Sequence, residues 1–182
     1  AVLPMGFSWA FHLAQRSHDY IASQAMPGHD SLMDRRPLPR PSSSRAMLML
    51  YADNANHLGL SAPIVNRSRV VLANALNEHG LRTHETLEAS LTATTLGARI
   101  DGAIGVVAQT PERVAALDQA LLAIEQGSRI TSADLRRVVG HITCAMLLRR
   151  PLLALLNRVY DFINADIENH CTVWPSVKEE LR

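Results

Sequence analysis

The sequence predicts an α+β fold over residues 1–109, followed by a wholly helical region. Two observations predict the first part: helical spacing of apolar residues alternates with short strand-forming runs, and a strong hairpin pattern covers residues 47–58. One observation predicts the second part, because apolar residues recur at helical spacing in three successive segments after residue 110. Helices that pack on short strands form a layered α+β arrangement.

The composition is that of a globular chain with one domain, or one domain and a small appendage. Of the 182 residues, 47% are hydrophobic and 19% are charged, and the net charge of +1 neither requires nor excludes a nucleic-acid partner. Two cysteines, Cys144 and Cys171, are too few for a disulfide framework or a zinc site, and Cys144 is expected in the core. We expect neither a secretory signal nor a membrane span, and therefore an intracellular protein of the cytoplasm or nucleus.

The N-terminal segment predicts a strand, a turn and a helix. Residues 1–6 are apolar and contain proline and glycine, as in a strand that enters a turn. The absence of an initiator methionine before this strand indicates a piece of a longer protein. Ser8 is the expected N-cap of a helix that ends near Ala25. One face of this helix is expected to carry Phe11, Ala14, Gln15 and His18.

A basic loop is expected at about residues 27–45. Proline, glycine and serine interrupt any regular structure there, and four arginines (Arg35, Arg36, Arg40 and Arg45) make the loop basic. A solvated connector is the favoured interpretation, and a loop that contacts phosphates is the alternative.

Residues 47–58 predict a β-hairpin with a carboxylate at its tip. Met47 to Tyr51 favour a strand, Asp53 and Asn54 favour a tight turn, and the residues up to Leu58 can return as a second strand. Turn chemistry by itself accounts for an Asp-Asn pair. The alternative is a binding role, because burying a carboxylate is costly unless it is paired or binds a metal.

A helix and three short strands are expected between the hairpin and residue 109. The helix runs from about Pro63 to His79, with Ser61 or Asn66 as its cap and Gly80 at its end. Strands are expected near residues 81–84, 95–100 and 103–108. The apolar face of the helix is expected to contain Val65, Val70 or Val71, Ala73 and Leu76.

Three helices are expected after residue 110. The first helix starts at Thr110 and Pro111 and ends at Gly127. The second helix starts with a capping box from Thr131 to Asp134, and the third helix starts at Pro151. The tail at residues 170–182 has no predicted structure. The expected apolar faces are, helix by helix, Val114, Leu117, Leu121 and Ile124; Leu135, Val138, Val139, Ile142 and Met146; and Leu152, Leu155, Leu156, Val159 and Ile163.

Four motifs occur in the order found in the reverse transcriptases of retrotransposons. Residues 3–10 (LPMGFSWA) resemble the "LPMG-x-S-x-A" turn of that family, and residues 51–54 (YADN) resemble its tyrosine-x-Asp-Asp box. Residues 96–101 (LGARID) resemble the strand that follows, and residues 135–160 resemble the helical region after it. The resemblance therefore covers most of the chain in the order of the family.

This resemblance implies a partial polymerase palm at residues 1–109 and a helical thumb or connection region at residues 110–169. It implies that Asp53 is a catalytic residue and a ligand of Mg²⁺. The implied partners are an RNA or DNA template-primer, deoxynucleoside triphosphates and the rest of a polymerase polyprotein, with no membrane. The residues implied to bind nucleotide and template are Pro4, Met5, Gly6, Tyr51 and Asn54, and those of the primer grip are Leu96 and Gly97.

Nucleotidyl transfer gives a physical reason for a carboxylate at such a tip. Two metal ions about 3.5–4 Å apart stabilise the attacking and leaving oxygens, and Mg²⁺ prefers hard oxygen ligands, including carboxylates. The chain departs from the family, however, because Asn54 replaces the second aspartate. Asp19, Asp30 and Asp34 lie between the first two motifs, so none takes the place of the earlier palm aspartate. We therefore expect a fragment or remnant that is inactive as an isolated chain.

Two other classes of function remain open at this point. One is a noncatalytic helical module that binds nucleic acid or protein through the loop arginines and through Arg136, Arg137, Arg149 and Arg150, although solvated surface explains these arginines equally well. The other is a metal hydrolase, which is disfavoured because the eight histidines show no HExxH-like spacing.

Overall fold

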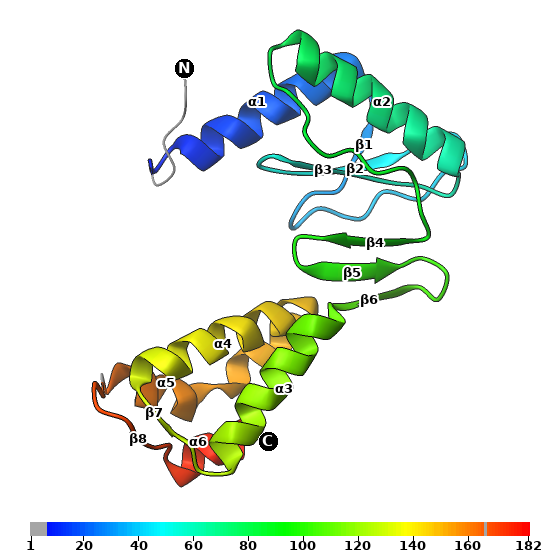
Figure 1. Ribbon diagram of the computed structural model, residues 1–182. Coiled ribbons are helices and arrows are strands. Elements are labelled where there is room, and N and C mark those ends of the chain that lie inside the picture. The colour runs from blue at the N-terminus through cyan, green and yellow to red at the C-terminus, as the bar shows by residue number, and fades with distance from the viewer. Residues whose placement is uncertain (1–6, 166) are drawn as a thin grey trace. The chain divides into compact units, whose positions relative to one another are not determined.

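The computed structural model describes residues 7–165 and 167–182, and it confirms an α+β fold. Contacts divide the chain into two compact units, Ala1–Ser90 and Leu91–Arg182, each with its own hydrophobic core (Figure 1). The expected boundary at residue 109 concerns functional regions and stays a prediction.

In the first unit, two helices cover one face of a three-stranded sheet (Figure 1). The helices are α1 (Ala10–Ala25) and α2 (Ala62–Glu78), and the sheet has the order β1-β2-β3. Strand β1 (Asp30–Ser31) runs parallel to β2 (Met47–Tyr51), which pairs antiparallel with β3 (Asn54–Leu58). Apolar side chains from both helices and β2 form the core: Ile21, Ala22, Leu48, Leu72 and Leu76.

The structure confirms the predicted hairpin and the ends of both helices to within a residue or two. The N-cap of α1 is Trp9 rather than Ser8, and among the described residues no side chain caps this end. The apolar face of α2 was predicted only in part: Leu76 is buried as expected, but Leu72 is buried as well, whereas Val70 and Val71 are exposed. The correct face repeats every three to four residues through Leu72 and Leu76, and both valines lie beside it.

The second unit begins with a meander of three antiparallel strands. These are β4 (Thr92–Thr95), β5 (Ala98–Asp101) and β6 (Val106–Gln109), and the sheet order is β4-β5-β6. The strand expected at residues 81–84 is absent from the described structure, because that stretch is irregular. The strand expected at residues 95–100 is instead a hairpin, since Leu96 (φ +49°) and Gly97 (φ +78°) both have positive φ angles and thereby reverse the chain.

The rest of the second unit is a bundle of helices around one apolar core (Figure 1). It contains α3 (Pro111–Glu125), α4 (Ser132–Met146), the 3₁₀ segment η1 (Leu147–Leu155), α5 (Asn157–Asn164) and α6 (Pro175–Glu180). A two-stranded sheet joins β7 (Arg129–Ile130) to β8 (Cys171–Thr172). The fully buried members of the core are Leu135, Val159, Phe162, Val173 and Val177.

Two details of the bundle differ from the prediction. The third helix begins at Asn157 rather than at Pro151, because Arg149 has a non-helical backbone and residues 147–155 form a 3₁₀ segment. As a result Leu152 and Leu155 are exposed, whereas Leu156 and Val159 are buried. The C-terminal tail, for which nothing was predicted, contributes β8, α6 and the buried Val173 and Val177.

One stretch of the described chain, Ser132–Leu155, is long and apolar enough to cross a membrane by length and composition alone. No such run was expected. The structure divides this stretch into α4 and η1, with the non-helical Arg149 inside η1. Leu135, Val139 and Ile142 of α4 lie in the core of the second unit.

Candidate functional site

The candidate site is the tip of the β2–β3 hairpin in the first unit. Tyr51 pairs with Asn54, so Ala52 and Asp53 form a two-residue turn. Ala52 has a φ of +49°, in the left-handed region that costs a residue with a side chain about 1–2 kcal/mol. Such a conformation persists only where the surrounding structure holds it.

Helix α1 holds both peptide groups that flank the Cα atom of Ala52. Gln15 Oε1 accepts a hydrogen bond from the Ala52 backbone N–H at 2.8 Å, and His18 Nδ1 donates to the Ala52 carbonyl at 2.9 Å. Gln15 Nε2 donates in turn to Asp19 Oδ1 at 3.0 Å and to the Leu50 carbonyl at 3.4 Å. The turn is therefore held by a helix that is 34–37 residues earlier in the chain.

The aromatic residue of the hairpin is held by the same helix. The rings of Phe11 and Tyr51 meet edge to face with their centroids 5.3 Å apart, an arrangement that aromatic pairs favour. Both side chains are about half exposed. The first turn of α1 therefore lies beside Tyr51.

Asp53 is exposed at the tip, and Asn54 Nδ2 donates a hydrogen bond to Asp53 Oδ1 at 3.2 Å. The structure thus brings together Tyr51, Asp53 and Asn54, and their proposed roles stay predictions. The other three predicted nucleotide-binding residues, Pro4, Met5 and Gly6, lie outside the described residues. Within the described part of the chain, no group of three or more His, Cys, Asp or Glu side chains is arranged to hold a metal ion.

A partly buried polar cluster is formed by His18 of α1, His57 of β3 and Arg69 of α2. Burial, together with the nearby Arg69 and His18, lowers the pKa of His57 to about 4. His57 Nδ1 donates to Ser68 Oγ at 2.9 Å, because the Ser68 hydroxyl proton is donated to Met26 Sδ. Within the described structure, His18 Nε2 and Arg69 Nε are buried and have no hydrogen-bond partner.

The two residues of the predicted primer grip, Leu96 and Gly97, lie in the second unit, at the turn between β4 and β5 rather than within a strand. Arg113 of α3 lies over this turn and donates to the Gly97 carbonyl at 3.5 Å. A Cβ atom added at Gly97 would collide with the Arg113 guanidinium. The positive φ of Gly97 favours glycine here, whereas the flexible end of the Arg113 side chain is able to move away from an added Cβ atom.

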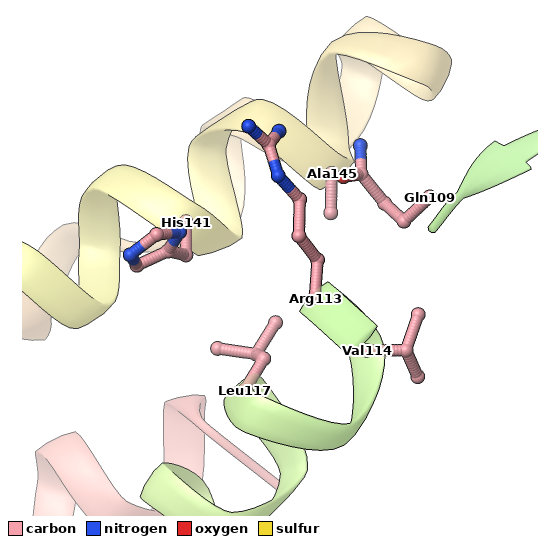
Figure 2. A pocket seen from close by; sticks show the side chains of 6 residues that line it. All are labelled: Gln109, Arg113, Val114, Leu117, His141 and Ala145. Carbon is pink, nitrogen blue, oxygen red and sulfur yellow. The ribbon is translucent and has the colours of Figure 1, made fainter. Parts of the chain in front are cut away.

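A groove runs between α3 and α4 beside this turn, as Figure 2 shows. Arg113 extends from the start of α3 toward α4, and His141 and Ala145 line the opposite side. Arg113 Nη1 also lies 3.5 Å from Cys144 Sγ, and Gln109 Nε2 donates to the Cys144 carbonyl at 3.2 Å. The groove continues as a space of about 380 Å³ along Glu112, Ala116, Ala120 and Val138.

The remaining charged residues give less support to a site. In the basic loop, Arg45 lies 3.8 Å from Asp30 and Arg35 lies 3.7 Å from Asp34, so part of the positive charge is paired. Arg137 of α4 pairs with Asp134 one turn earlier at 3.6 Å. His29 and His79 bond to the backbone carbonyls of Met26 and Ala75. These contacts are those of ordinary surface residues.

Comparison of the chain with protein-family models, with curated proteins and with solved structures found no match.

Sequence reasoning did not assign three residues that the structure places at the candidate positions: Gln15, His18 and Arg113. The prediction that Gln15 and His18 share one face of α1 was correct and contained a usable signal. Two polar side chains on the apolar face of an amphipathic helix require a polar partner in the fold. No comparable signal marks Arg113, because an arginine in the first turn of a helix is common on protein surfaces.

Proposed function

We propose that this chain carries part of the palm and thumb of a retroelement reverse transcriptase, an RNA-directed DNA polymerase that uses two-metal nucleotidyl transfer. The observation that supports this most is the packing of α1 on the tip of the hairpin, through the bonds from Gln15 and His18 to Ala52. The resemblance implies this neighbourhood, since it implies that the "LPMG" turn and the YADN box face one groove.

The proposed roles follow from where the side chains lie. Asp53 is exposed on a turn that is held from behind, so its carboxylate is free to meet a hydrated Mg²⁺ ion. Tyr51 presents a half-exposed ring for the primer end or the incoming nucleotide. The Asn54 amide oxygen can also coordinate a metal ion but adds no negative charge. Leu96 and Gly97 would hold the primer from the turn that Arg113 supports.

Two Mg²⁺ ions need more negative charge than this hairpin supplies, because Asn54 stands where the family has an aspartate. We therefore predict that residues 1–182 alone do not extend a primer. Joined to an upstream polymerase segment that supplies the other palm aspartate, the same chain is expected to extend a DNA primer on an RNA template with Mg²⁺.

Primer-extension assays test this proposal. In the active longer chain, Asp53→Asn is expected to abolish extension, whereas Asp34→Asn, an exposed loop carboxylate, serves as the matched control and leaves extension in place. Strong Mg²⁺-dependent extension by residues 1–182 alone would contradict the need for a further carboxylate. A longer chain that binds template-primer but never extends it would instead favour a noncatalytic module that binds nucleic acid.

A further inference from the structure

His18 is a polar residue at a position that an apolar side chain normally fills. It is only 5% exposed, and its neighbours on the buried face of α1 are Ile21 and Ala22. Burying an imidazole costs free energy unless both ring nitrogens find partners. Within the described residues only Nδ1 has one, the Ala52 carbonyl, and Nε2 has none. Among the described residues, Ala52 is therefore the only hydrogen-bond partner of this buried ring.

We propose that His18 is a positioning residue for the hairpin tip, which sets the direction of the Asp53 carboxylate by holding the carbonyl group of Ala52. The catalytic meaning of this role rests on the proposed function, because in a polymerase the direction of Asp53 decides where the metal ion lies. The geometric part, the control of the turn by His18, stands without it.

Helix α1 holds two different peptide planes, one on each side of the Ala52 Cα atom. The Ala52 N–H belongs to the peptide group before its Cα atom, and the Ala52 carbonyl belongs to the peptide group after it. Gln15 binds the first and His18 binds the second. Together they determine both backbone dihedral angles of Ala52, including the unfavourable φ of +49°. The second peptide group contains the nitrogen of Asp53, so its plane orients that residue.

The tautomer of His18 follows from the same contact. A carbonyl oxygen only accepts hydrogen bonds, so the proton must be on Nδ1. The groups that face the cluster from neighbouring elements are His57 of β3 and Arg69 of α2, and Asp19 lies on α1 itself, bonded to Gln15. Nδ1 therefore carries a proton, and Nε2 has no hydrogen-bond partner among the described residues.

Nuclear magnetic resonance on residues 1–182 tests the geometric part directly. Long-range ¹H–¹⁵N spectra of the histidine ring are expected to show His18 as the Nδ1–H tautomer at neutral pH. This measurement requires no variant, so it does not depend on how well a substituted chain folds. An Nε2–H tautomer would overturn the proposal.

A matched set of substitutions then separates a positioning role from simple packing. Asn carries an amide nitrogen at the place of Nδ1, whereas Gln carries one at the place of Nε2. We expect His18→Asn to keep the ψ of Ala52, measured from its three-bond couplings, and to keep the chemical shift of the Asp53 amide, which belongs to the peptide group that His18 holds. His18→Gln and His18→Leu are expected to lose both. His12→Leu, on an exposed part of the same helix, is the control and should change neither.

The longer active chain tests the catalytic part. There, His18→Leu is expected to lower kcat by roughly ten- to a hundred-fold with little change in KM, as a small displacement of a reacting group does, and His18→Asn is expected to restore most of the loss. Unchanged Ala52 couplings in His18→Leu would refute the positioning role itself. If the nuclear magnetic resonance results are as expected but no longer chain has polymerase activity, the proposed function is refuted. The control of the turn by His18 then still holds.

Discussion

His57 shows how a single buried side chain can make the stability of the first unit depend on pH. Its pKa is about 4 in the folded chain, against an ordinary value of 6.5, chiefly because burial disfavours the charged ring and further because Arg69 and His18 lie nearby. Between these two values the unfolded chain binds more protons than the folded chain. Stability therefore rises with pH across this interval and levels off above it.

We predict that urea denaturation of the first unit shows a loss of stability on the order of 2–3 kcal/mol as the pH falls from 6.5 to about 4. In His57→Asn, which retains a donor toward Ser68 but does not titrate, this loss should largely vanish. The lowered pKa of Asp134, which arises from hydrogen bonds with Thr131, acts at still lower pH and in the second unit. An equal pH dependence in the wild type and in His57→Asn would contradict this account.

At the scale of elements, the start of α4 differs from the starts of the other helices. Thr131 Oγ1 accepts from the Asp134 backbone N–H at 3.2 Å, while the Asp134 carboxylate accepts from the Thr131 N–H at 3.0 Å. This reciprocal pair is a complete capping box. Thr110 has the same position at the start of α3, yet within the described structure its side chain makes no capping hydrogen bond.

Thr131→Ala is therefore expected to destabilise the second unit by about 1 kcal/mol, and Thr131→Ser to have little effect. Thr110→Ala is the matched control, and its unfolding midpoint in urea should stay close to that of the wild type. Equal losses at the two threonines would show that the capping hydrogen bonds do not account for the difference.

At the scale of the whole molecule, the chain has two cores that share no residue. One core lies between α1, α2 and β2, and the other is centred on Phe162 and Leu135 in the helical bundle. Because each unit buries its own apolar surface, we expect each to have its own unfolding transition.

Phe162→Ala tests this at the centre of the larger core. The loss of a fully buried ring is expected to cost the second unit about 3–5 kcal/mol, as measured by hydrogen exchange of the amides of α4 and α5. The exchange of the β2–β3 amides in the first unit should stay unchanged. Leu122→Ala, at an exposed position of α3, is the control. Faster exchange in both units after Phe162→Ala would show that the two cores unfold together.

The sequence by itself determined the features of this protein that depend on neighbours along the chain. The hairpin at residues 47–58, the ends of α1 and α2 and the capping box of α4 were correctly predicted, because strand preference, caps and turn residues act over a few positions. The apolar face of α4 was also predicted correctly. The predictions for Val70 and Val71 failed because tertiary packing decided which face of α2 is buried, and the strand expected next to Gly97 failed because of a positive φ.

Only the tertiary structure decided what surrounds Asp53. The bonds from Gln15 and His18 to Ala52, and the ring contact of Phe11 with Tyr51, join α1 to a hairpin more than thirty residues away. Local preferences carry no information about such a distance, since the pairing depends on how α1 and α2 share one face of the sheet. The tip carries its carboxylate because of the sequence, and it is held in an unfavourable backbone conformation because of the fold.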